Sequence, residues 1–229
     1  MSFLESSFYR KYFLPGFIFQ SVVIAGGYGT AREIVEYFLK YGPLGGLLGM
    51  ILITTVIWTI LLALTFEFSR IFRAYDYRTF FRNLLGKFWF VFEILYFVLM
   101  LIVLAVIGSA AGVLLRENFG LPYLLGALIM LAAIGLLTFL GTTVIEAALS
   151  IWSFVLYSVY AIFLIVAFLK FGPLIQKNLA SAAILPGWAK GGFKYALYNL
   201  GVIPAVLFCI NYIETRKEAF LSGFIGALI

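Results

Sequence analysis

The chain has 229 residues, of which 64% are hydrophobic and only 11% are charged. A soluble domain carries about 25% charged residues, so this composition excludes an ordinary soluble domain and predicts a polytopic, all-α membrane protein. The formal charge of +6 does not indicate nucleic-acid binding, because basic residues in such proteins cluster in loops and orient the helices.

Residue types and motifs also argue against enzyme chemistry. The chain has no histidine, which removes the commonest general base and the usual transition-metal ligand. Its single cysteine, Cys209, can form neither an internal disulfide nor a multi-cysteine metal site. No Ser–His–Asp set, HExxH, P-loop or CxxC motif occurs, so we predict neither an enzyme nor a bound cofactor.

The first predicted membrane helix covers residues 13–40 and follows a short cytoplasmic tail with an interfacial helix at 8–13. Three glycines, Gly26, Gly27 and Gly29, interrupt it at residues 25–30. Glycine costs about 1 kcal/mol in a helix interior, and unwound backbone in a membrane must be buried in protein or line a cavity. A broken helix at membrane depth is a sequence indication of a transporter's binding site.

The next four predicted helices follow in quick succession, at residues 44–69, 89–115, 121–140 and 144–169. The basic loop at 70–87 separates the first two and predicts a cytoplasmic side, with an amphipathic helix lying at the interface. Gly108 and Gly112 give the helix at 89–115 a face of small residues for close packing.

A long outside segment at 171–192 is predicted to turn at Gly172-Pro173 and Pro186-Gly187, with a short surface helix at 174–183. Helix 6 at 192–213 is predicted to be interrupted at 199–201 and at Pro204, since proline costs about 3 kcal/mol in a helix interior. A turn at 213–218 precedes a seventh helix that starts at Ala219 and is too short to span a membrane.

Interruptions in the first and sixth helices are typical of a five-helix unit that repeats with inverted topology. We therefore expect a single membrane domain, with residues 1–170 as the first repeat and 171–229 as the outside loop, helix 6 and an incomplete helix 7. The alternative interpretation is that the glycines allow tight packing and that Pro204 only kinks its helix.

The stretch at residues 25–50, AGGYGTAREIVEYFLKYGPLGGLLGM, resembles the N-terminal signature of YkvI-type bacterial membrane proteins. Those proteins are similar to amino acid–polyamine–organocation transporters with the LeuT fold. The resemblance implies a plasma-membrane protein with ten or more helices arranged five plus five. It also implies binding of a small organic solute, such as an amino acid, and coupling to Na⁺ or H⁺.

Matched position by position, the resemblance implies a solute site where the two interrupted helices meet. Backbone groups of the unwound part of helix 1, the nearest side chains able to form hydrogen bonds, and the broken part of helix 6 would line it. These residues are Ala25, Gly26, Gly27, Tyr28, Gly29, Thr30, Tyr198, Asn199 and Gly201.

Three charged residues follow the predicted break, namely Arg32, Glu33 and Glu36. Arg32 with Glu36, and Glu36 with Lys40, are i,i+4 neighbours and could pair along one helix face. Glu33 or Glu36 could act as a proton carrier or outer gate. The alternative is a helix end that leaves the membrane with paired, solvated charges.

Two hypotheses about function follow. The first is a secondary-transporter-like protein that binds its solute at the breaks of helices 1 and 6. The second is a non-transporting membrane sensor, or an inactive truncated copy, because helices 8–10 of the resemblance are expected to be missing. A second chain that completes the fold would be a partner besides the bilayer and the solute, and no nucleic-acid partner is expected.

Overall fold

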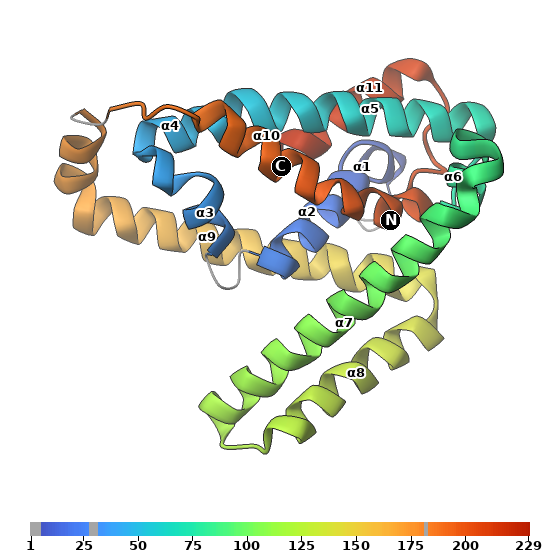
Figure 1. Ribbon diagram of the computed structural model, residues 1–229, viewed down its shortest axis with the longest axis horizontal. Helices are drawn as coiled ribbons and strands as arrows, with labels where there is room; N and C mark the ends of the chain where they lie inside the picture. Colours follow the sequence, from blue (N-terminus) through green and yellow to red (C-terminus); the bar gives the residue numbers. More distant parts are fainter. Residues whose placement is uncertain (1–5, 28–31, 181–182) are drawn as a thin grey trace. The chain divides into compact units, whose positions relative to one another are not determined.

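The computed structural model describes residues 6–27, 32–180 and 183–229, and within these ranges it is helical with no strand (Figure 1). The elements are α1 (Ser7–Tyr12), α2 (Leu14–Gly27), α3 (Arg32–Tyr37), η3 (Leu39–Tyr41), α4 (Pro43–Leu48), η4 (Gly49–Thr54), α5 (Thr55–Phe72), α6 (Tyr77–Leu85), η5 (Gly86–Phe88), α7 (Trp89–Phe119), α8 (Tyr123–Leu140), α9 (Thr142–Ala180), α10 (Trp188–Tyr198), η6 (Asn199–Cys209) and α11 (Arg216–Leu228).

Five helices in these ranges are long and apolar enough to cross a membrane, and α2 contains a shorter apolar segment, Leu14–Ile24. The prediction of a polytopic all-α membrane protein is confirmed. The five are Pro43–Phe72, Tyr77–Phe119, Tyr123–Leu140, Thr142–Ala180 and Trp188–Cys209.

The chain divides into two compact units. The first unit combines residues 1–77 with 149–229, and it therefore contains the predicted helices 1, 2, 6 and 7. The second unit, residues 78–148, contains most of α6, all of α7 and α8, and the start of α9.

In the first unit, α5 lies along α11, α2 packs on η6 and α11, and α10 packs on η4 (Figure 1). Residues 49–54 of helix 2 form a π-helix, a wider turn that sequence analysis did not predict. Thr54 Oγ1 donates to the carbonyl of Gly49 (3.2 Å) and to that of Gly192 in α10 (3.1 Å). The wide turn is therefore tied directly to helix 6.

In the second unit, α7 and α8 form an antiparallel pair. Gly112 permits it, because a Cβ there would meet the carbonyl oxygen and ring of Tyr123 at 2.8 Å. Gly126 similarly approaches the Cα of Gly112, with 3.1 Å between that atom and an added Cβ. The predicted close packing of the helix at 89–115 is confirmed at Gly112, whereas a Cβ on Gly108 would come no closer than 4.0 Å to Leu131.

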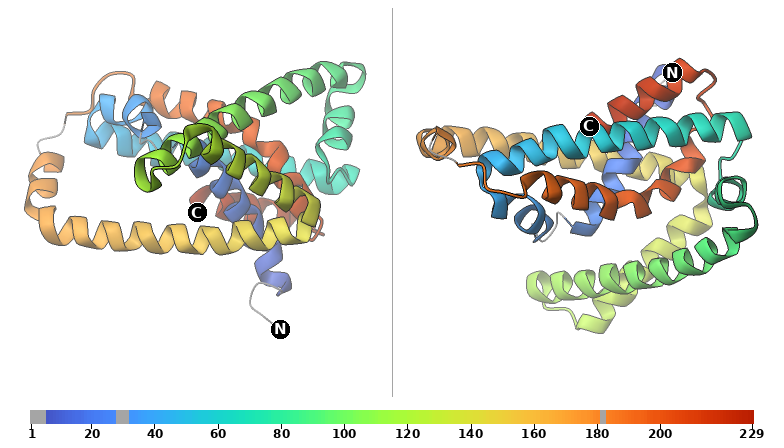
Figure 2. Two further views of the ribbon diagram at one scale, coloured as in Figure 1. Left: turned by 90° about the horizontal axis from the view of Figure 1, so that it is seen from below. Right: turned by 45° about the horizontal axis from the view of Figure 1, so that its top comes forward.

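The predicted turn at Gly172-Pro173 and the separate surface helix at 174–183 are wrong. Instead, α9 continues to Ala180 with Pro173 inside it. Figure 2 shows α9 changing direction towards its C-terminal end, the usual effect of an internal proline. A proline is tolerated in a membrane helix because local adjustments satisfy the carbonyl that it leaves free.

The other predicted landmarks are close to the observed ones. Gly187, in the predicted Pro186-Gly187 turn, has a φ of +90°, which glycine adopts without strain. The short helices predicted at 8–13 and in the basic loop correspond to α1 and α6. The seventh helix begins at Arg216, earlier than the predicted Ala219, because Thr215 and Glu218 form a capping box.

Candidate site at the junction of helices 1 and 6

The predicted break in helix 1 falls between α2, which ends at Gly27, and α3, which begins at Arg32. Ala25, Gly26 and Gly27 form the end of α2. The predicted site residues Tyr28, Gly29 and Thr30 lie outside the described residues, so an unwound backbone there stays a prediction.

Helix 6 changes its type where the sequence predicts an interruption. The α-helix α10 ends at Tyr198, and η6 continues from Asn199 as a 3₁₀-helix with Pro204 inside it. Runs of 3₁₀-helix longer than three or four residues are uncommon, and in mid-helix they often mark a hinge or strain. The change of helix type is therefore a specific feature of this junction.

The three predicted site residues of helix 6 differ in accessibility. The Asn199 side chain is buried, and its Nδ2 donates to the carbonyl of Tyr195 in the same helix (3.1 Å). Tyr198 and Gly201 are exposed. In this arrangement the Tyr198 side chain is accessible, while the Asn199 amide stabilises the end of α10.

An aromatic cluster that sequence analysis missed connects the two helices. The Tyr195 ring, only 1% exposed, lies 5.6 Å from Tyr37, 4.9 Å from Phe38 and 5.6 Å from Trp58 between ring centroids. Tyr37 also stacks on Tyr198 at 6.2 Å. Tyr195 and Tyr198 are three residues apart on one helix face, which was the available sequence signal.

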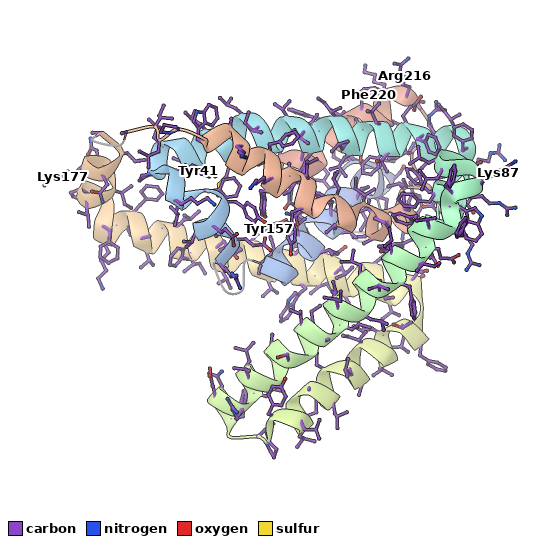
Figure 3. All side chains as sticks on the ribbon, in the orientation of Figure 1. Tyr41, Lys87, Tyr157, Lys177, Arg216 and Phe220 are labelled. Atoms are coloured by element: carbon purple, nitrogen blue, oxygen red, sulfur yellow. The ribbon has the colours of Figure 1, made fainter. Side chains whose placement is uncertain are left out.

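Close packing beside this cluster depends on glycine. A Cβ on Gly191 would lie 2.2 Å from the carbonyl oxygen of Tyr37 and 2.4 Å from the ring of Tyr41. Figure 3 labels Tyr41, which lies beside α10. The C-terminal half of helix 1 is thus in backbone contact with helix 6.

The charged residues of α3 do not behave alike. Arg32 Nε lies 3.8 Å from Glu36 Oε2, and their side chains are 84% and 53% exposed, which fits the solvated, paired alternative. In contrast, Glu33 Oε2 is buried without a well-formed hydrogen bond, and the Tyr198 hydroxyl is the interacting group near it. Glu33 is therefore the carboxylate of α3 that helix 6 contacts.

The predicted Glu36–Lys40 pair is wrong. Lys40 Nζ instead lies over the ring of Tyr41, 5.2 Å from its centroid. The α-helical spacing that would bring residues 36 and 40 together is lost because α3 ends at Tyr37 and the 3₁₀-turn η3 begins at Leu39.

Away from the helices that could cross a membrane, ion pairs join α1 to the loop before α11 and to α11 itself. Lys11 Nζ lies 2.8 Å from Glu214 Oε2 and 3.0 Å from Glu218 Oε1, and these two carboxylates raise the Lys11 pKa. Burial raises the pKa of Glu218, but hydrogen bonds from the Glu214 N–H, Lys11 and the Thr215 N–H outweigh it and lower that pKa.

Comparison with known proteins finds a relative that is also a membrane protein. The chain is 29% identical over 218 residues to YkvI of Bacillus subtilis (strain 168), described as an uncharacterized membrane protein. The alignment covers 92% of this chain and 60% of YkvI, so the chain spans less than two thirds of that relative. No protein-family model and no solved structure matches. The resemblance to a YkvI-type membrane protein is confirmed.

Proposed function

We propose that this chain, a membrane protein related to YkvI, is transporter-like and binds a small organic solute where the two halves of helix 1 meet helix 6. An amino acid is the solute class that the family resemblance implies, with Na⁺ or H⁺ as the coupling ion. The observation that carries the proposal is a pattern of paired contacts among helices 1, 2, 6 and 7.

These contacts match those expected if the two segments form an inverted repeat. A two-fold axis that exchanges helix 1 with helix 6, and helix 2 with helix 7, predicts a pair of equivalent contacts. If helix 1 touches helix 7, then helix 6 must touch helix 2. Both contacts occur, as α2 on α11 and as α10 on η4. The same axis leaves two other contacts unchanged, because it only exchanges their partners. These contacts, of helix 1 with helix 6 (α2 on η6) and of helix 2 with helix 7 (α5 on α11), also occur.

Glycine positions support the same relation in sequence. A Cβ on Gly16 would lie 2.8 Å from the Cα of Gly226, and one on Gly192 would lie 2.5 Å from the carbonyl oxygen of Gly49. Gly192 follows Gly16 by 176 residues and Gly226 follows Gly49 by 177. The two close contacts are therefore at positions that would be equivalent, within one residue, in the two proposed repeats.

The same offset relates the two predicted interruptions in part. Residues 25–30 of helix 1 correspond to residues 201–206 of helix 6, which contain Gly201 and Pro204 within η6. Tyr198 and Asn199 correspond instead to positions 22 and 23, before the predicted interruption in helix 1. Solute sites in inverted-repeat transporters form where such segments meet. This correspondence favours a binding role for both segments over simple kinks.

The backbone carbonyls and side chains at the junction suit a solute that carries an amine. Carbonyl groups at the end of α2 are acceptors, the rings of Tyr37 and Tyr198 present π-faces, and Glu33 supplies a carboxylate. An amino acid or other ammonium compound would satisfy the buried oxygen of Glu33. Glu33 is also the candidate proton carrier if coupling uses H⁺.

Binding is tested by replacing Gly27 with Leu in the purified full chain. The twenty amino acids are first screened for an increase in thermal stability, since a ligand at 100 times its Kd stabilises by about 2.7 kcal/mol. We expect Gly27→Leu to abolish stabilisation by the active compound while the protein stays folded. Gly135→Leu is the matched control, because a Cβ added there meets no atom within 4 Å.

Transport is tested separately, by uptake of the same compound into liposomes that contain the protein. Solute-specific flux supports a transporter, whereas binding without flux supports a sensor. A folded Gly27→Leu protein that binds like the wild type would show that the site is misplaced.

A further inference from the structure

A hollow in the second unit lies where α6 leads through η5 into α7. It is lined by Arg82, Asn83, Gly86, Lys87 and Trp89. Gly86, with a φ of +55°, ends α6 and directs the chain into η5. Two basic side chains and an indole thus come together within eight residues of sequence.

The two cations of this hollow are not neutralised by the protein. Across residues 6–27, 32–180 and 183–229, no acidic side chain lies within ion-pair distance of Arg82 or Lys87. The neighbouring Arg78 differs, because its Nε donates to Glu93 Oε1 at 3.0 Å. The hollow therefore has excess positive charge that an anion would balance.

The surroundings of the hollow are apolar and exposed. Leu84, Leu85 and Phe88 are 51%, 39% and 71% exposed, although they alternate with the basic residues along the same stretch. The long apolar segment of α7 follows immediately. A soluble anion would leave these side chains in water, whereas a lipid would cover them with its acyl chains.

Trp89 lines the hollow and is also the first residue of the apolar helix α7. Its ring lies 5.9 Å below the guanidinium carbon of Arg78, which the Glu93 carboxylate holds in place. Tryptophan is enriched at the membrane–water interface, where its indole lies at the level of the headgroups. Figure 3 labels Lys87, whose side chain extends from the ribbon in the same stretch.

We propose that this hollow is a binding site for the phosphate headgroup of an anionic phospholipid. The forked guanidinium of Arg82 hydrogen-bonds the phosphate oxygens, and the Lys87 ammonium adds a compact charge. Leu85 and Phe88 contact the acyl chains. The basic loop then does more than orient the helices, because it selects lipids by headgroup charge.

The test uses the full chain in detergent with equal amounts of palmitoyl-oleoyl phosphatidylglycerol and phosphatidylcholine, and counts bound lipids by native mass spectrometry. Each cation that lies beside the headgroup contributes about fivefold to binding of an anionic lipid. We expect Arg82→Gln/Lys87→Gln to weaken phosphatidylglycerol binding about thirtyfold. Lys87→Gln alone should weaken it about fivefold.

Lys190→Gln/Lys194→Gln is the matched control, because it removes the same charge from exposed positions of α10. It should bind phosphatidylglycerol like the wild type. Equal binding of the two lipids by the wild type, or wild-type binding by the folded Arg82/Lys87 variant, would overturn the proposal. Displacement of the lipid by millimolar glycerol 3-phosphate would overturn it in favour of a soluble phosphate ligand.

Discussion

The two units differ in how much of their apolar helices is buried. In the first unit, 44% of the most apolar part of Trp188–Cys209 is buried, whereas none of the corresponding part of Tyr77–Phe119 in the second unit is. Both segments are apolar, so hydrophobicity does not distinguish them. Lipid tails are as apolar as leucine, and close helix contact in a membrane therefore depends on shape and on small residues.

Small residues are placed accordingly. In the first unit, four glycines form two backbone contacts between helices, and a Cβ on Gly223 of α11 would lie 2.5 Å from the backbone nitrogen of Ala63 in α5. In the second unit the close contacts are concentrated at Gly112 and Gly126, while Gly135 faces open space. Glycines of several helices therefore allow close packing in the first unit, although the span Thr142–Ala180, most of which belongs to that unit, has only 6% of its most apolar part buried.

The largest effect is expected from a methyl group at Gly192 in the first unit. Its added Cβ would lie 2.5 Å from the Gly49 carbonyl oxygen, a backbone atom that cannot move without disturbing η4. Gly192→Ala should therefore lower the free energy of unfolding by about 1–3 kcal/mol. Thermal unfolding in detergent micelles measures the change.

Gly135→Ala in α8 is the matched control for that substitution. It removes a flexible residue from a helix interior and meets no atom within 4 Å. It should change stability by less than about 1 kcal/mol, and in the stabilising direction. Equal losses at both positions would show that the two units do not differ in packing.

An intermediate, pH-dependent effect is expected from Glu218 in the first unit. Because its pKa is lowered in the fold, its stabilisation is present above the ordinary value of 4.5 and is lost as the pH falls through the folded pKa. Lys11 has the opposite sign: its raised pKa makes its contribution full below 10.5 and lost as the pH rises through the folded value.

Glu218→Gln should therefore lower the Tm at neutral pH, and the difference from wild type should shrink as the pH falls below 4.5. Glu93→Gln in the second unit is the comparison. Its partner Arg78 is 60% exposed, whereas Lys11 is 15% exposed, so solvent screens the Glu93 pair more strongly. A larger loss for Glu93→Gln, measured by the same thermal unfolding, would contradict the assignment of the tighter charged contact to the first unit.

Sequence features with a local cause were predicted well. Asn199, Gly201 and Pro204 correctly indicated a change in helix 6, because backbone freedom and a missing N–H act at the residue itself. The capping box at Thr215 and Glu218 is a signal of the same kind, and it places the start of α11 at Arg216 instead of the predicted Ala219. Pro173 shows the limit of such signals, since a Gly-Pro pair makes a turn in water and only a bend in a membrane helix.

Features that depend on distant partners could not be predicted. The π-helix at Gly49–Thr54 is linked to Gly192, 138 residues beyond the Thr54 that joins them. The clustering of Tyr37, Trp58 and Tyr195 likewise depends on how three helices meet. The segments of the candidate site were thus predicted from sequence, whereas the aromatic cluster between helices 1 and 6 required the fold.

The smallest effect is expected at a hydroxyl pair that joins α2 to α9 within the first unit. Ser21 Oγ and Ser153 Oγ lie 2.5 Å apart, and each also lies within hydrogen-bond distance of a carbonyl in its own helix, of Phe17 and Leu149 respectively. Because each hydroxyl has one proton, one serine donates to the other, which in turn donates to the carbonyl of its own helix. Hydrogen bonds between membrane helices average about 0.6 kcal/mol, because the separated helices find other partners. A double-mutant cycle with Ser21→Ala and Ser153→Ala should give a coupling energy of about this size.

Ser158 provides the matched control on the same helix, since among residues 6–27, 32–180 and 183–229 the carbonyl of Phe154 is the one group to which its Oγ donates. Ser21→Ala combined with Ser158→Ala should be additive, because no interaction joins the two side chains. A coupling energy near zero for Ser21 and Ser153 would mean that α2 and α9 are held together by the packing of Phe17 against Phe154 and Tyr157. Ser21 and Ser153 would then only donate hydrogen bonds to carbonyls of their own helices, as Ser158 does.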